Sequence, residues 1–584
     1  MTDCILNIEN LTIGFGENTP VVDQVSLEIR KGRMAAIVGE SGSGKTMLAR
    51  SVLRLLPDGA KIKSGRISFG DQDLAQLSAK QMQTVRGAEI GMIFQEPMVS
   101  LNPSLKIGFQ MTEAVRKHRD MSESEANALA IEHLKRVRIP SPEACLNAYP
   151  HEFSGGMRQR IMIASTLMLS PKLLIADEPT TALDCLVQKD ILELLKDISH
   201  SDGTAVLLIS HDLSLVAHYA DDVLVMEHGR AVEQGKVAEV IGQPSHPYTR
   251  KLLSALPRAE EPRKNQHQEN QLVRVRNVNV RYPIRKKWVF EPQTYKPVLH
   301  DVSFDIRSGE TLAVVGESGS GKTTLGRAML QLVPLTSGHI DIDGHAITAT
   351  TKPDFKAMSS VVQLIFQDPY SSLSPRQTIS DIVSEPLRRL GTQNIVQKAE
   401  TMIEEVGLGR QFLSRYPNEL SGGQRQRVAI ARALICDPKL VIADEPVSAL
   451  DITVQAQILE LLDRLRRERG FSCLFISHDL GVVEQIADRV AVMYKGRLVE
   501  LADVQNLFAK ACHPYTRDLL SALPELRDNQ EGGYALVPRA PNPFALPADL
   551  SPAGPSPGAE VFYHQISDDH IVACIRNHPA QTLN

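Results

Sequence analysis

The sequence predicts an α/β protein in which one domain occurs twice, each copy with a mostly parallel core sheet and an inserted helical subdomain. Three observations predict this class. Several short motifs recur in the same order in both halves of the 584-residue chain. In each half a short apolar run precedes a glycine-rich loop and a segment with helical periodicity. Further apolar runs alternate with helix-like segments, which favours a parallel sheet with helices on both faces.

The repeat is a tandem duplication of a whole domain and not a short solenoid repeat. The motif GESGSGKT occurs at Gly39–Thr46 and again at Gly316–Thr323. The motifs FQ[ED]P, [LV]IADEP, ISHDL and HPYTR each occur twice in the same order. The later motifs keep one constant spacing between the copies, since Ser154 and Ser421, Asp177 and Asp444, and His211 and His478 all lie 267 residues apart.

Four parts follow from this repeat. The first copy is predicted at 1–256 and the second at 272–524. The segment 257–271, PRAEEPRKNQHQENQ, is polar and charged with little to bury, so it is predicted to be a linker. The tail 525–584 is rich in Pro, Gly and Ala, and we expect it to be extended or partly disordered.

Within each copy the elements can be placed in order. The apolar run MAAIVG, the strand-like KLLIAD and KLVIAD, and the runs AVLLIS and SCLFIS suit buried parallel strands. The segment MLARSVLRLL after the first glycine loop has helical periodicity. The segments 97–152 and 369–419 are mainly helix-like, and we expect each to form a helical subdomain inserted into its copy.

Composition excludes some classes of protein. A net charge of −5 gives no electrostatic case for nucleic acid as the main partner. No apolar run approaches the roughly 18–20 residues that span a bilayer, and MTDCILNIEN lacks the features of a signal peptide. We therefore expect a cytosolic chain that can still dock onto a membrane protein. The seven cysteines include no Cys-x-x-Cys pair, which favours free thiols.

The glycine loops predict binding of nucleotide phosphate. Successive backbone N–H groups in such a loop point at an anion, and the following helix adds its positive end. Lys45 and Lys322 are predicted to reach the β- and γ-phosphates, and the hydroxyls of Thr46 and Thr323 to hold Mg²⁺. The predicted phosphate-binding residues are Gly39, Glu40, Ser41, Gly42, Ser43, Gly44, Lys45 and Thr46, with Gly316, Glu317, Ser318, Gly319, Ser320, Gly321, Lys322 and Thr323.

Candidate catalytic groups follow the later strands. Asp177 and Asp444 end apolar strands, where a carboxylate would orient the water around Mg²⁺, and Glu178 and Glu445 follow at a position that suits polarising the attacking water. In the alternative interpretation, the adjacent Asp and Glu merely belong to a solvated loop, and each His has a structural role, as a lone His usually does. The predicted γ-phosphate contacts His211 and His478 nevertheless share one offset of 33 residues from the Glu. Gln95 and Gln367 are expected to sense Mg²⁺ and water.

The segments SGGMRQR and SGGQRQR, placed between the glycine loop and the Asp-Glu strand, resemble those of the ATP-binding-cassette superfamily. The resemblance covers nearly all of the chain. It implies that two cassettes face each other head to tail around two ATP molecules, each held by one glycine loop and covered by the other copy's SGG segment. Site one would then consist of the loop, Gln, Asp, Glu and His of the first copy together with Ser421, Gly422 and Gly423 of the second. Site two would consist of the corresponding residues of the second copy together with Ser154, Gly155 and Gly156 of the first.

Other positions acquire roles only through this resemblance. Phe15 and Tyr282 match the family's adenine-stacking aromatic, although a strand aromatic is more often a core residue. Asp184 and Asp451 match the loop that links the two sites. Met157 stands where the second copy has Gln424, but the Ser and Gly donors are intact. We therefore expect two competent sites, with Met157 marking a different paralogue.

The motifs SGGMRQR, FQDPYSSLSPR, ADEPVSALD and HPYTR followed by LLSALP resemble those of the fused ATPase subunits of oligopeptide, dipeptide and nickel importers. The resemblance implies an ATP hydrolase that uses ATP and Mg²⁺ on the cytoplasmic face of the inner membrane as a peripheral protein. Its partners would be two transmembrane permeases and, through them, an extracytoplasmic solute-binding protein. Peptides are the first expectation for the solute, ahead of a metallophore, nickel, an opine or a glutathione-like compound.

Two alternatives remain at this point. A soluble twin-cassette ATPase acting on ribosomes or DNA would need no permease, but such proteins usually carry a longer charged linker or inserted zinc modules. A regulatory protein that binds ATP without turnover would be expected to lack the Glu or the His in one copy, whereas each copy here has the Glu and the His. Importers of this type often carry a C-terminal cysteine cluster for an iron–sulfur centre, whereas the tail here holds only Cys574, so no cluster is expected.

Overall fold

The computed structural model divides into two compact units. The first unit comprises Met1–Leu256 with Pro524–Val537, and the second Pro257–Leu523 with Pro538–Asn584. Most of the predicted linker, 257–269, lies outside the described residues. The described residues are 3–16, 19–95, 100–181, 183–254, 270–284, 293–448, 450–528, 534–539, 546–547, 549–554, 561–567 and 569–576.

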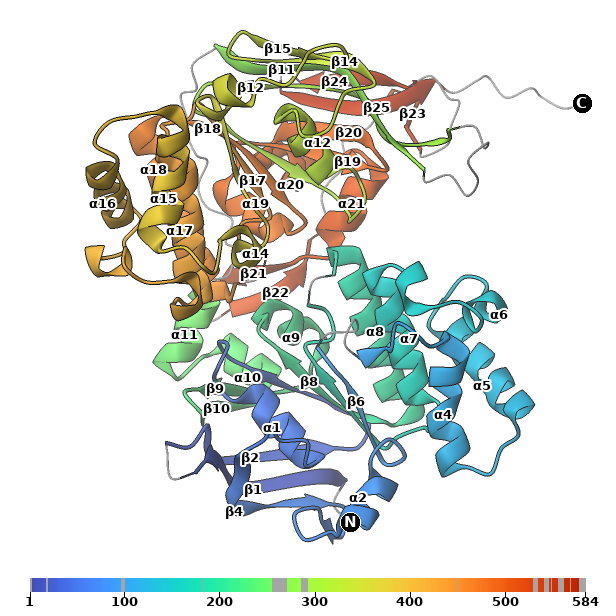
Figure 1. Ribbon diagram of the computed structural model, residues 1–584. Helices are drawn as coiled ribbons and strands as arrows, with labels where there is room; N and C mark the ends of the chain where they lie inside the picture. The colour runs from blue at the N-terminus through green and yellow to red at the C-terminus, as the bar shows by residue number, and fades with distance from the viewer. Residues whose placement is uncertain are drawn as a thin grey trace, which may run out of the picture. The chain divides into compact units, whose positions relative to one another are not determined.

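The first unit contains an antiparallel sheet and a mostly parallel sheet (Figure 1). The antiparallel sheet has the strand order β2-β1-β4-β5, and the second sheet has the order β10-β9-β3-β8-β7-β6. All pairs in the second sheet are parallel except β9 with β10. The strands are β1 (Cys4–Phe15), β2 (Val22–Arg30), β3 (Met34–Val38), β4 (Ala60–Phe69), β5 (Gln72–Asp73), β6 (Ile90–Ile93), β7 (Leu173–Asp177), β8 (Ala205–Ser210), β9 (Asp222–Glu227) and β10 (Arg230–Lys236).

The core of this unit lies between the two sheets and explains the apolar runs of the sequence. Every residue of β3 and β8 is buried, as expected for parallel strands covered on both faces. Side chains of β1, such as Leu6 and Ile8, belong to the same buried cluster as Leu207 and Ile209 of β8. Because β7, β3 and β8 are parallel neighbours, their carboxyl ends lie at one edge of the sheet, where ligands bind in open α/β sheets.

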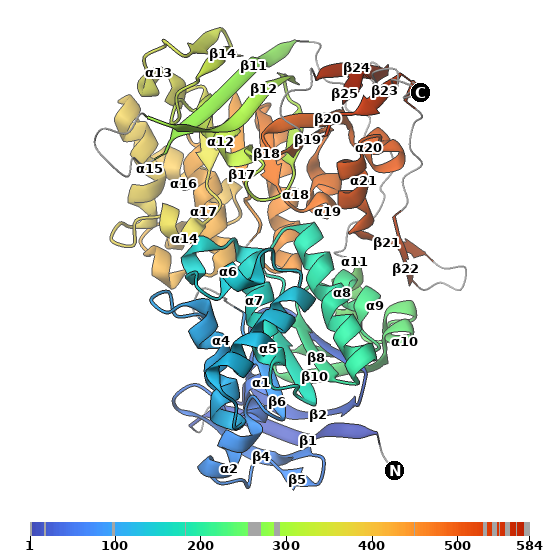
Figure 2. The ribbon, with the colours of Figure 1, turned by 90° about the vertical axis from the view of Figure 1, so that its right-hand side faces the viewer.

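Helices cover the parallel sheet and form the predicted inserted subdomain. Figure 2 shows α4, α5 and α7 as one group of helices in this unit. A capping box in which Ser122 and Glu125 exchange hydrogen bonds starts α5. The helices are α1 (Lys45–Val52), α2 (Ala79–Val85), α4 (Ile107–His118), α5 (Glu123–Arg136), α6 (Pro142–Cys145), η1 (Pro150–Glu152), α7 (Gly155–Leu167), α8 (Cys185–Asp202), α9 (Leu213–Tyr219), α10 (Val237–Gly242) and α11 (Pro247–Ser254).

The second unit repeats this plan. Its antiparallel sheet has the order β12-β11-β14-β15, and its large sheet begins β16-β17-β18-β13-β19-β20. The strands of these sheets are β11 (Gln271–Pro283), β12 (Tyr295–Arg307), β13 (Thr311–Val315), β14 (Ser337–Ile342), β15 (His345–Thr348), β16 (Val362–Ile365), β17 (Leu440–Asp444), β18 (Ser472–Ser477), β19 (Arg489–Tyr494) and β20 (Arg497–Asp503). The predicted fold class is therefore confirmed in both units.

The helices of the second unit match those of the first in order. The inserted subdomain contains α15 and α16, which pack on α17. The helices are α12 (Lys322–Met329), α13 (Phe355–Ser359), α14 (Pro369–Ser372), α15 (Ile379–Leu390), α16 (Ile395–Glu405), η2 (Arg410–Phe412), η3 (Pro417–Glu419), α17 (Gly422–Leu434), α18 (Ile452–Arg469), α19 (Leu480–Ile486), α20 (Val504–Lys510) and α21 (Pro514–Ser521).

The tail after residue 524, which was expected to be extended or partly disordered, contains paired strands among its described residues. The strands β21 (Pro524–Asp528) and β22 (Tyr534–Pro538) pair with each other. Further along, β25 (His570–Arg576) joins β20 in the large sheet and also pairs with β23 (Leu550–Pro552) and β24 (Phe562–Ser567). The reason is local, because HIVACIR is an apolar strand sequence that the Pro- and Gly-rich average of the tail conceals.

In the part of the chain that the structure describes, no helix is long and apolar enough to cross a membrane. All seven cysteines are described and are free thiols. Burial raises the pKa of the Cys473 thiol to about 12, and that of Cys145 to about 11, so these two side chains behave as apolar core residues.

Candidate active site

The glycine loop of the first unit lies between β3 and α1 and is shaped by close backbone contacts. Gly39 has a φ of 153°, and a Cβ there would lie 2.2 Å from the carbonyl oxygen of Met226. Lys45 is only 4% exposed, and its Nζ donates to the carbonyl oxygens of Gly39 at 2.7 Å and Glu40 at 2.8 Å. The lysine therefore closes the loop and holds its positive charge inside it.

The loop of the second unit has the same construction. Lys322 Nζ donates to the carbonyl oxygens of Gly316 at 2.6 Å and Glu317 at 2.9 Å. One serine hydroxyl in each loop is buried and has no hydrogen-bond partner within the described residues, namely Ser43 in the first unit and Ser320 in the second. Buried hydroxyls are normally satisfied, so these two are suited to a polar ligand such as a phosphate oxygen.

The threonine after each lysine contacts the carboxylate that ends the neighbouring strand. Thr46 Oγ1 donates to Asp177 Oδ1 at 3.0 Å, and Thr323 Oγ1 donates to Asp444 Oδ1 at 3.2 Å. Asp177 is fully buried, and its Oδ2 has no partner in the described part of the chain. Burial raises the pKa of both Asp177 and Asp444, against the opposing effect of the threonine hydrogen bond. A nearby cation would favour the ionised carboxylates.

The glutamate after each strand is the centre of a hydrogen-bonded group. Glu178 Oε2 accepts from Gln95 Nε2 at 2.8 Å and from Thr181 Oγ1 at 3.0 Å, and His211 Nδ1 lies 3.4 Å away. The backbone of Glu178 has a φ of 47°, a left-handed conformation that is uncommon for this residue type. Such strain is typical of functional positions.

The second unit reproduces this group. Glu445 Oε2 accepts from Gln367 Nε2 at 2.7 Å, His478 Nδ1 lies 3.2 Å away, and φ is again 47°. One bond differs, because the hydroxyl of Ser448, at the position of Thr181, donates to the backbone oxygen of Glu445 and not to its carboxylate. The two groups therefore share their Gln and His contacts but not their hydroxyl contact.

The glutamate and histidine shift each other's pKa. Burial alone would raise the pKa of Glu178, but the hydrogen bond and charge of His211 outweigh it and the pKa is lowered. Burial alone would lower the pKa of His211, but the hydrogen bond and charge of Glu178 raise it above its usual value. The pKa of Glu445 is lowered by His478 in the same way. Both glutamates are thus held as carboxylates, the form that can polarise a water molecule.

The two SGG segments, Ser154–Gly156 and Ser421–Gly423, begin helices α7 and α17. Ser421 and Gln424 form a capping box, in which Gln424 Oε1 accepts from the backbone N–H of Ser421 at 3.0 Å. Met157 has no side-chain acceptor for the corresponding N–H of Ser154, although Ser154 still caps the N–H of Met157 at 3.4 Å. The substitution therefore removes a capping bond, while Ser154 and Gly155 remain exposed at the helix start.

Among the described residues of one unit, only some of the predicted site residues contact one another. Each unit brings its glycine loop, Asp, Glu, Gln and His together. No described hydrogen bond joins an SGG segment to the loop of its own unit. Phe15 at the end of β1 and Tyr282 near the end of β11 are each 37% exposed and lie in the antiparallel sheets. Asp184 and Asp451 are the N-cap residues of α8 and α18.

The structure adds one contact to each loop that the sequence did not predict. The hydroxyl of Tyr248 accepts from the backbone N–H of Glu40 at 3.0 Å, and that of Tyr515 accepts from the N–H of Glu317 at 2.8 Å. Both tyrosines are nearly buried and belong to the HPYTR motifs at the start of α11 and α21. The repeated HPYTR motif was the one feature of the sequence that could have indicated this contact. Its tyrosine connects each of these helices to a glycine loop.

The second unit also contains a buried polar group outside this site. Glu500, Cys512 and His570 place one potential metal ligand each within 4.8 Å of one another. The carboxylate of Glu500, however, already accepts from the backbone N–H groups of Cys512 and His513 and from His570 Nε2 at 2.8 Å. Glu233 accepts two equivalent backbone N–H groups in the first unit. We therefore interpret the group as the anchor of β25 on β20.

Family models match both units. The model described as "ABC transporter" matches residues 22–181 and 299–448. The model described as "Oligopeptide/dipeptide transporter, C-terminal region" matches residues 232–279 and 499–549. The first of these C-terminal matches runs through the predicted linker, and both include an HPYTR motif.

Relatives and a solved structure match most of the chain. The glutathione import ATP-binding protein GsiA of Salmonella paratyphi A (strain ATCC 9150 / SARB42) is 44% identical over 557 residues, which are 89% of this chain and 89% of that protein. The protein of the same name from Escherichia coli (strain K12) matches with the same identity and coverage. A chain in the crystal structure of the archaeal ribosomal stalk protein aP1 with the ribosome recycling factor aABCE1 has a TM-score of 0.60 and 18% identity, covering 91% of this chain and 96% of its own. At that identity the likeness shows the fold alone.

The duplicated family match and the 44% identity agree with the geometry of two loop–carboxylate–histidine groups. The chain belongs to the ABC transporter family and is an ATP-hydrolysing importer ATPase of the oligopeptide/dipeptide type, with two ATP-binding cassettes in one polypeptide.

Proposed function

We propose that this chain powers the uptake of a short peptide or glutathione-like solute through two membrane permeases. The C-terminal matches to oligopeptide/dipeptide transporters and the identity to the glutathione import proteins support this class of solute. The observation that carries the proposal is the complete set of Lys, Thr, Asp, Glu, Gln and His in both units, which is what two hydrolysing sites need.

The residues support Mg²⁺ as the partner of ATP. Hydroxyl and carboxylate oxygens suit this ion, and Thr46 with Asp177 and Thr323 with Asp444 supply them. Asp177 Oδ2, buried and without a partner in the described residues, fits a role toward a hydrated cation. Gln95 and Gln367 complete the proposed set. When bound, Mg²⁺ would neutralise charge on the phosphates.

In the proposed mechanism the chain positions water and phosphate and does little covalent chemistry. The backbone N–H groups of each loop hold the phosphates, and the lysine exchanges its carbonyl contacts for the β- and γ-phosphates. The ionised Glu178 or Glu445 orients the attacking water. His211 or His478, which shares its proton with that glutamate, donates to the γ-phosphate. Phe15 and Tyr282 would stack on the adenines.

We further propose that the two sites are composite. Ser154, Gly155 and Gly156 would cover the ATP on the second unit's loop, and Ser421, Gly422 and Gly423 the ATP on the first unit's. A Ser hydroxyl and backbone N–H groups at a helix start are good anion donors, and the SGG segments make no described bond to their own loops. Joining both cassettes in one chain, at 1–256 and 272–524, keeps them at high mutual concentration.

The permeases would hold the chain at the cytoplasmic side of the membrane as a peripheral protein. The test is affinity purification from detergent-solubilised membranes with Glu178→Gln and Glu445→Gln, which retain the ATP-bound state. Two multi-span permeases should copurify. The unsubstituted chain, reconstituted in proteoliposomes with those permeases and their solute-binding protein, should consume ATP in the presence of glutathione or short peptides. Recovery of ribosomal or DNA-repair proteins without any permease would contradict the proposal.

A further inference from the structure

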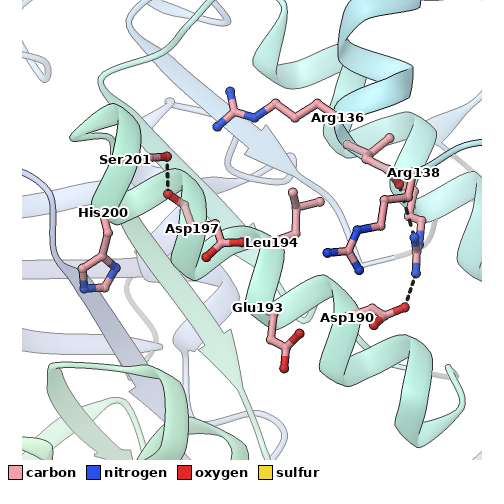
Figure 3. A pocket seen from close by; sticks show the side chains of 10 residues that line it. Arg136, Arg138, Asp190, Glu193, Leu194, Asp197, His200 and Ser201 are labelled. Carbon is pink, nitrogen blue, oxygen red and sulfur yellow. Dashed lines mark hydrogen bonds and ion pairs between the residues drawn. The ribbon is translucent and has the colours of Figure 1, made fainter.

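A polar pocket of about 550 Å³ lies in the first unit, away from the glycine loop (Figure 3). It is formed by the end of α5 and the residues after it, by α7 and by one side of α8. The lining residues are Arg136, Val137, Arg138, Arg160, Asp190, Glu193, Leu194, Asp197, His200 and Ser201. Its size is typical of sites for small molecules, which span roughly 300–1,000 Å³.

Two of the arginines that line this pocket form ion pairs with aspartates of α8. Arg160 pairs with Asp190 and donates to the carbonyl oxygen of Val137 at 3.3 Å. Arg136 pairs with Asp202 at 2.7 Å. These pairs hold α7 against α8 and the end of α5 against the end of α8. The helices that carry the remaining charged side chains are therefore held together by these contacts.

Three charged side chains remain. Arg138, Glu193 and Asp197 make no hydrogen bond or ion pair through their side chains within the described residues, and all three are exposed. Glu193 and Asp197 lie one turn apart on α8, about 6 Å along the helix axis. In Figure 3 the side chain of Arg138 extends from the segment after α5 toward α8, which carries both carboxylates. The pocket thus presents, among the residues that the structure describes, one free cation opposite two free anions.

The backbone of Arg138 has an unfavourable conformation, which is consistent with a binding role for this residue. Its φ is 59°, a conformation that favours glycine, and the structure gives the guanidinium no partner in the described residues that would offset this cost. The equivalent residue in the second unit is Gly407, with a φ of 77°. The equivalence is set by a shared bond, since Arg427 donates to the carbonyl oxygen of Val406 as Arg160 does to that of Val137.

The second unit has rearranged the charges of the same surface. Its Glu405–Arg469 pair repeats the Arg136–Asp202 pair with the signs exchanged. Arg464 stands at the position of Asp197 and donates to the carbonyl oxygen of Glu405 at 2.8 Å. The structural pair is therefore kept in both units, whereas the cation at 138 and the carboxylate at 197 belong to the first unit and have no counterpart at the equivalent positions of the second.

We propose that this pocket binds a small zwitterion, a free amino acid or short peptide, with its carboxylate on Arg138 and its ammonium group between Glu193 and Asp197. The planar guanidinium matches a carboxylate with two parallel hydrogen bonds, and an ammonium group offers three donors to the two acids. Opposite charges across one bounded pocket suit a small molecule better than a uniformly charged protein segment. The inference is independent of the proposed function, because binding is measured on the isolated chain.

The test is isothermal titration of the full chain with trialanine, whose two ends are charged. N-acetyl-trialanine and trialanine amide are the matched probes, since each lacks one charge. We expect saturable binding of trialanine, weakened about tenfold or more by blocking either end. Arg138→Gly and Asp197→Arg, which install the second unit's residues, should weaken it to a similar extent. Arg54→Gly is the control, because Arg54 is another exposed arginine of this unit with a positive φ, 51°.

Three outcomes would overturn the proposal. The first is no saturable binding of trialanine up to about 10 mM, a range in which even a weak site would be detected. The second is binding that is the same for both end-blocked probes or for both pocket variants. The third is binding of oligolysine, lost in Asp197→Arg, without binding of trialanine, which would identify a docking surface for basic protein segments.

Discussion

Replacing Tyr248 by Phe tests whether the HPYTR helix supports the glycine loop. The substitution removes one hydroxyl oxygen, which accepts the backbone N–H of Glu40 at 3.0 Å, and leaves the ring in place. Tyr248 is 5% exposed, so the ring keeps its packing. Leaving a buried donor without a partner costs about 1–3 kcal/mol. Because Glu40 is only partly buried, water can reach its N–H, and we expect about 1 kcal/mol.

This cost should appear in ATP binding, because the Glu40 carbonyl also holds Lys45. About 1 kcal/mol corresponds to an approximately fivefold weaker affinity for a fluorescent ATP analogue at the first unit's loop. Lys322→Ala in the background removes the phosphate-binding lysine of the second unit's loop, so that the first loop is the one measured. Tyr219→Phe is the matched control, since Tyr219 is also buried in this unit and its hydroxyl has no hydrogen bond within the described residues.

The pattern of results separates two roles for the hydroxyl. A lower melting temperature without nucleotide, together with unchanged affinity, would mean that Tyr248 stabilises the fold and does not shape the loop. Affinity and melting temperature both equal to those of Tyr219→Phe would refute the reasoning altogether.

Three further predictions concern the same sites. Glu178→Gln should lower the ATPase rate of the first site by about 10²–10⁴-fold while ATP still binds, because the amide cannot act as a base; single-turnover hydrolysis checks this. The Glu178–His211 pair should add stability where both are charged. Glu178 has a lowered pKa, so its contribution is lost as the pH falls through that value; His211 has a raised pKa, so its contribution is lost as the pH rises through it. Melting temperatures of the protein and of His211→Gln should therefore differ most in mildly acidic solution and converge at alkaline pH, and a constant difference would contradict the coupling. Gly156→Ala should cost about 1–3 kcal/mol, because its Cβ would lie 2.6 Å from a Val187 methyl, whereas Gly155→Ala meets its nearest atom at 3.7 Å; equal melting temperatures for the two variants would contradict this.

The sequence was sufficient for the parts of the fold that repeat. Buried parallel strands such as MAAIV and AVLLIS are apolar throughout, and the glycine loops have a strict pattern, so both could be placed without coordinates. The grouping of Gln95, Glu178 and His211 was implied by the resemblance to the ATP-binding-cassette superfamily. The structure supplies the hydrogen bonds that join them.

Other features depend on contacts between distant residues and could not be predicted. The bond from Glu40 to Tyr248 spans 208 positions and was signalled only by a repeated HPYTR motif. The strand β25 lies in a tail whose average composition is that of a disordered segment, and its pairing depends on β20 and on the bond between His570 and Glu500. Which charged side chains around Arg138 lack a partner depends on the Arg136–Asp202 and Arg160–Asp190 pairs, which the sequence does not show.

The central claim of composite ATP sites can be tested by cross-linking. Ser41 and Ser318 are exposed residues of the first and second glycine loops, and Ser421 is the exposed N-cap of α17. With Glu178→Gln and Glu445→Gln present and ATP bound, a short bifunctional thiol reagent should join the two introduced thiols in the variant Ser41→Cys/Ser421→Cys, with the product mapped by mass spectrometry. The same reagent should not join the introduced thiols in Ser318→Cys/Ser421→Cys. Cross-linking of the second pair and not the first would show that each SGG segment serves its own loop, and would contradict the account.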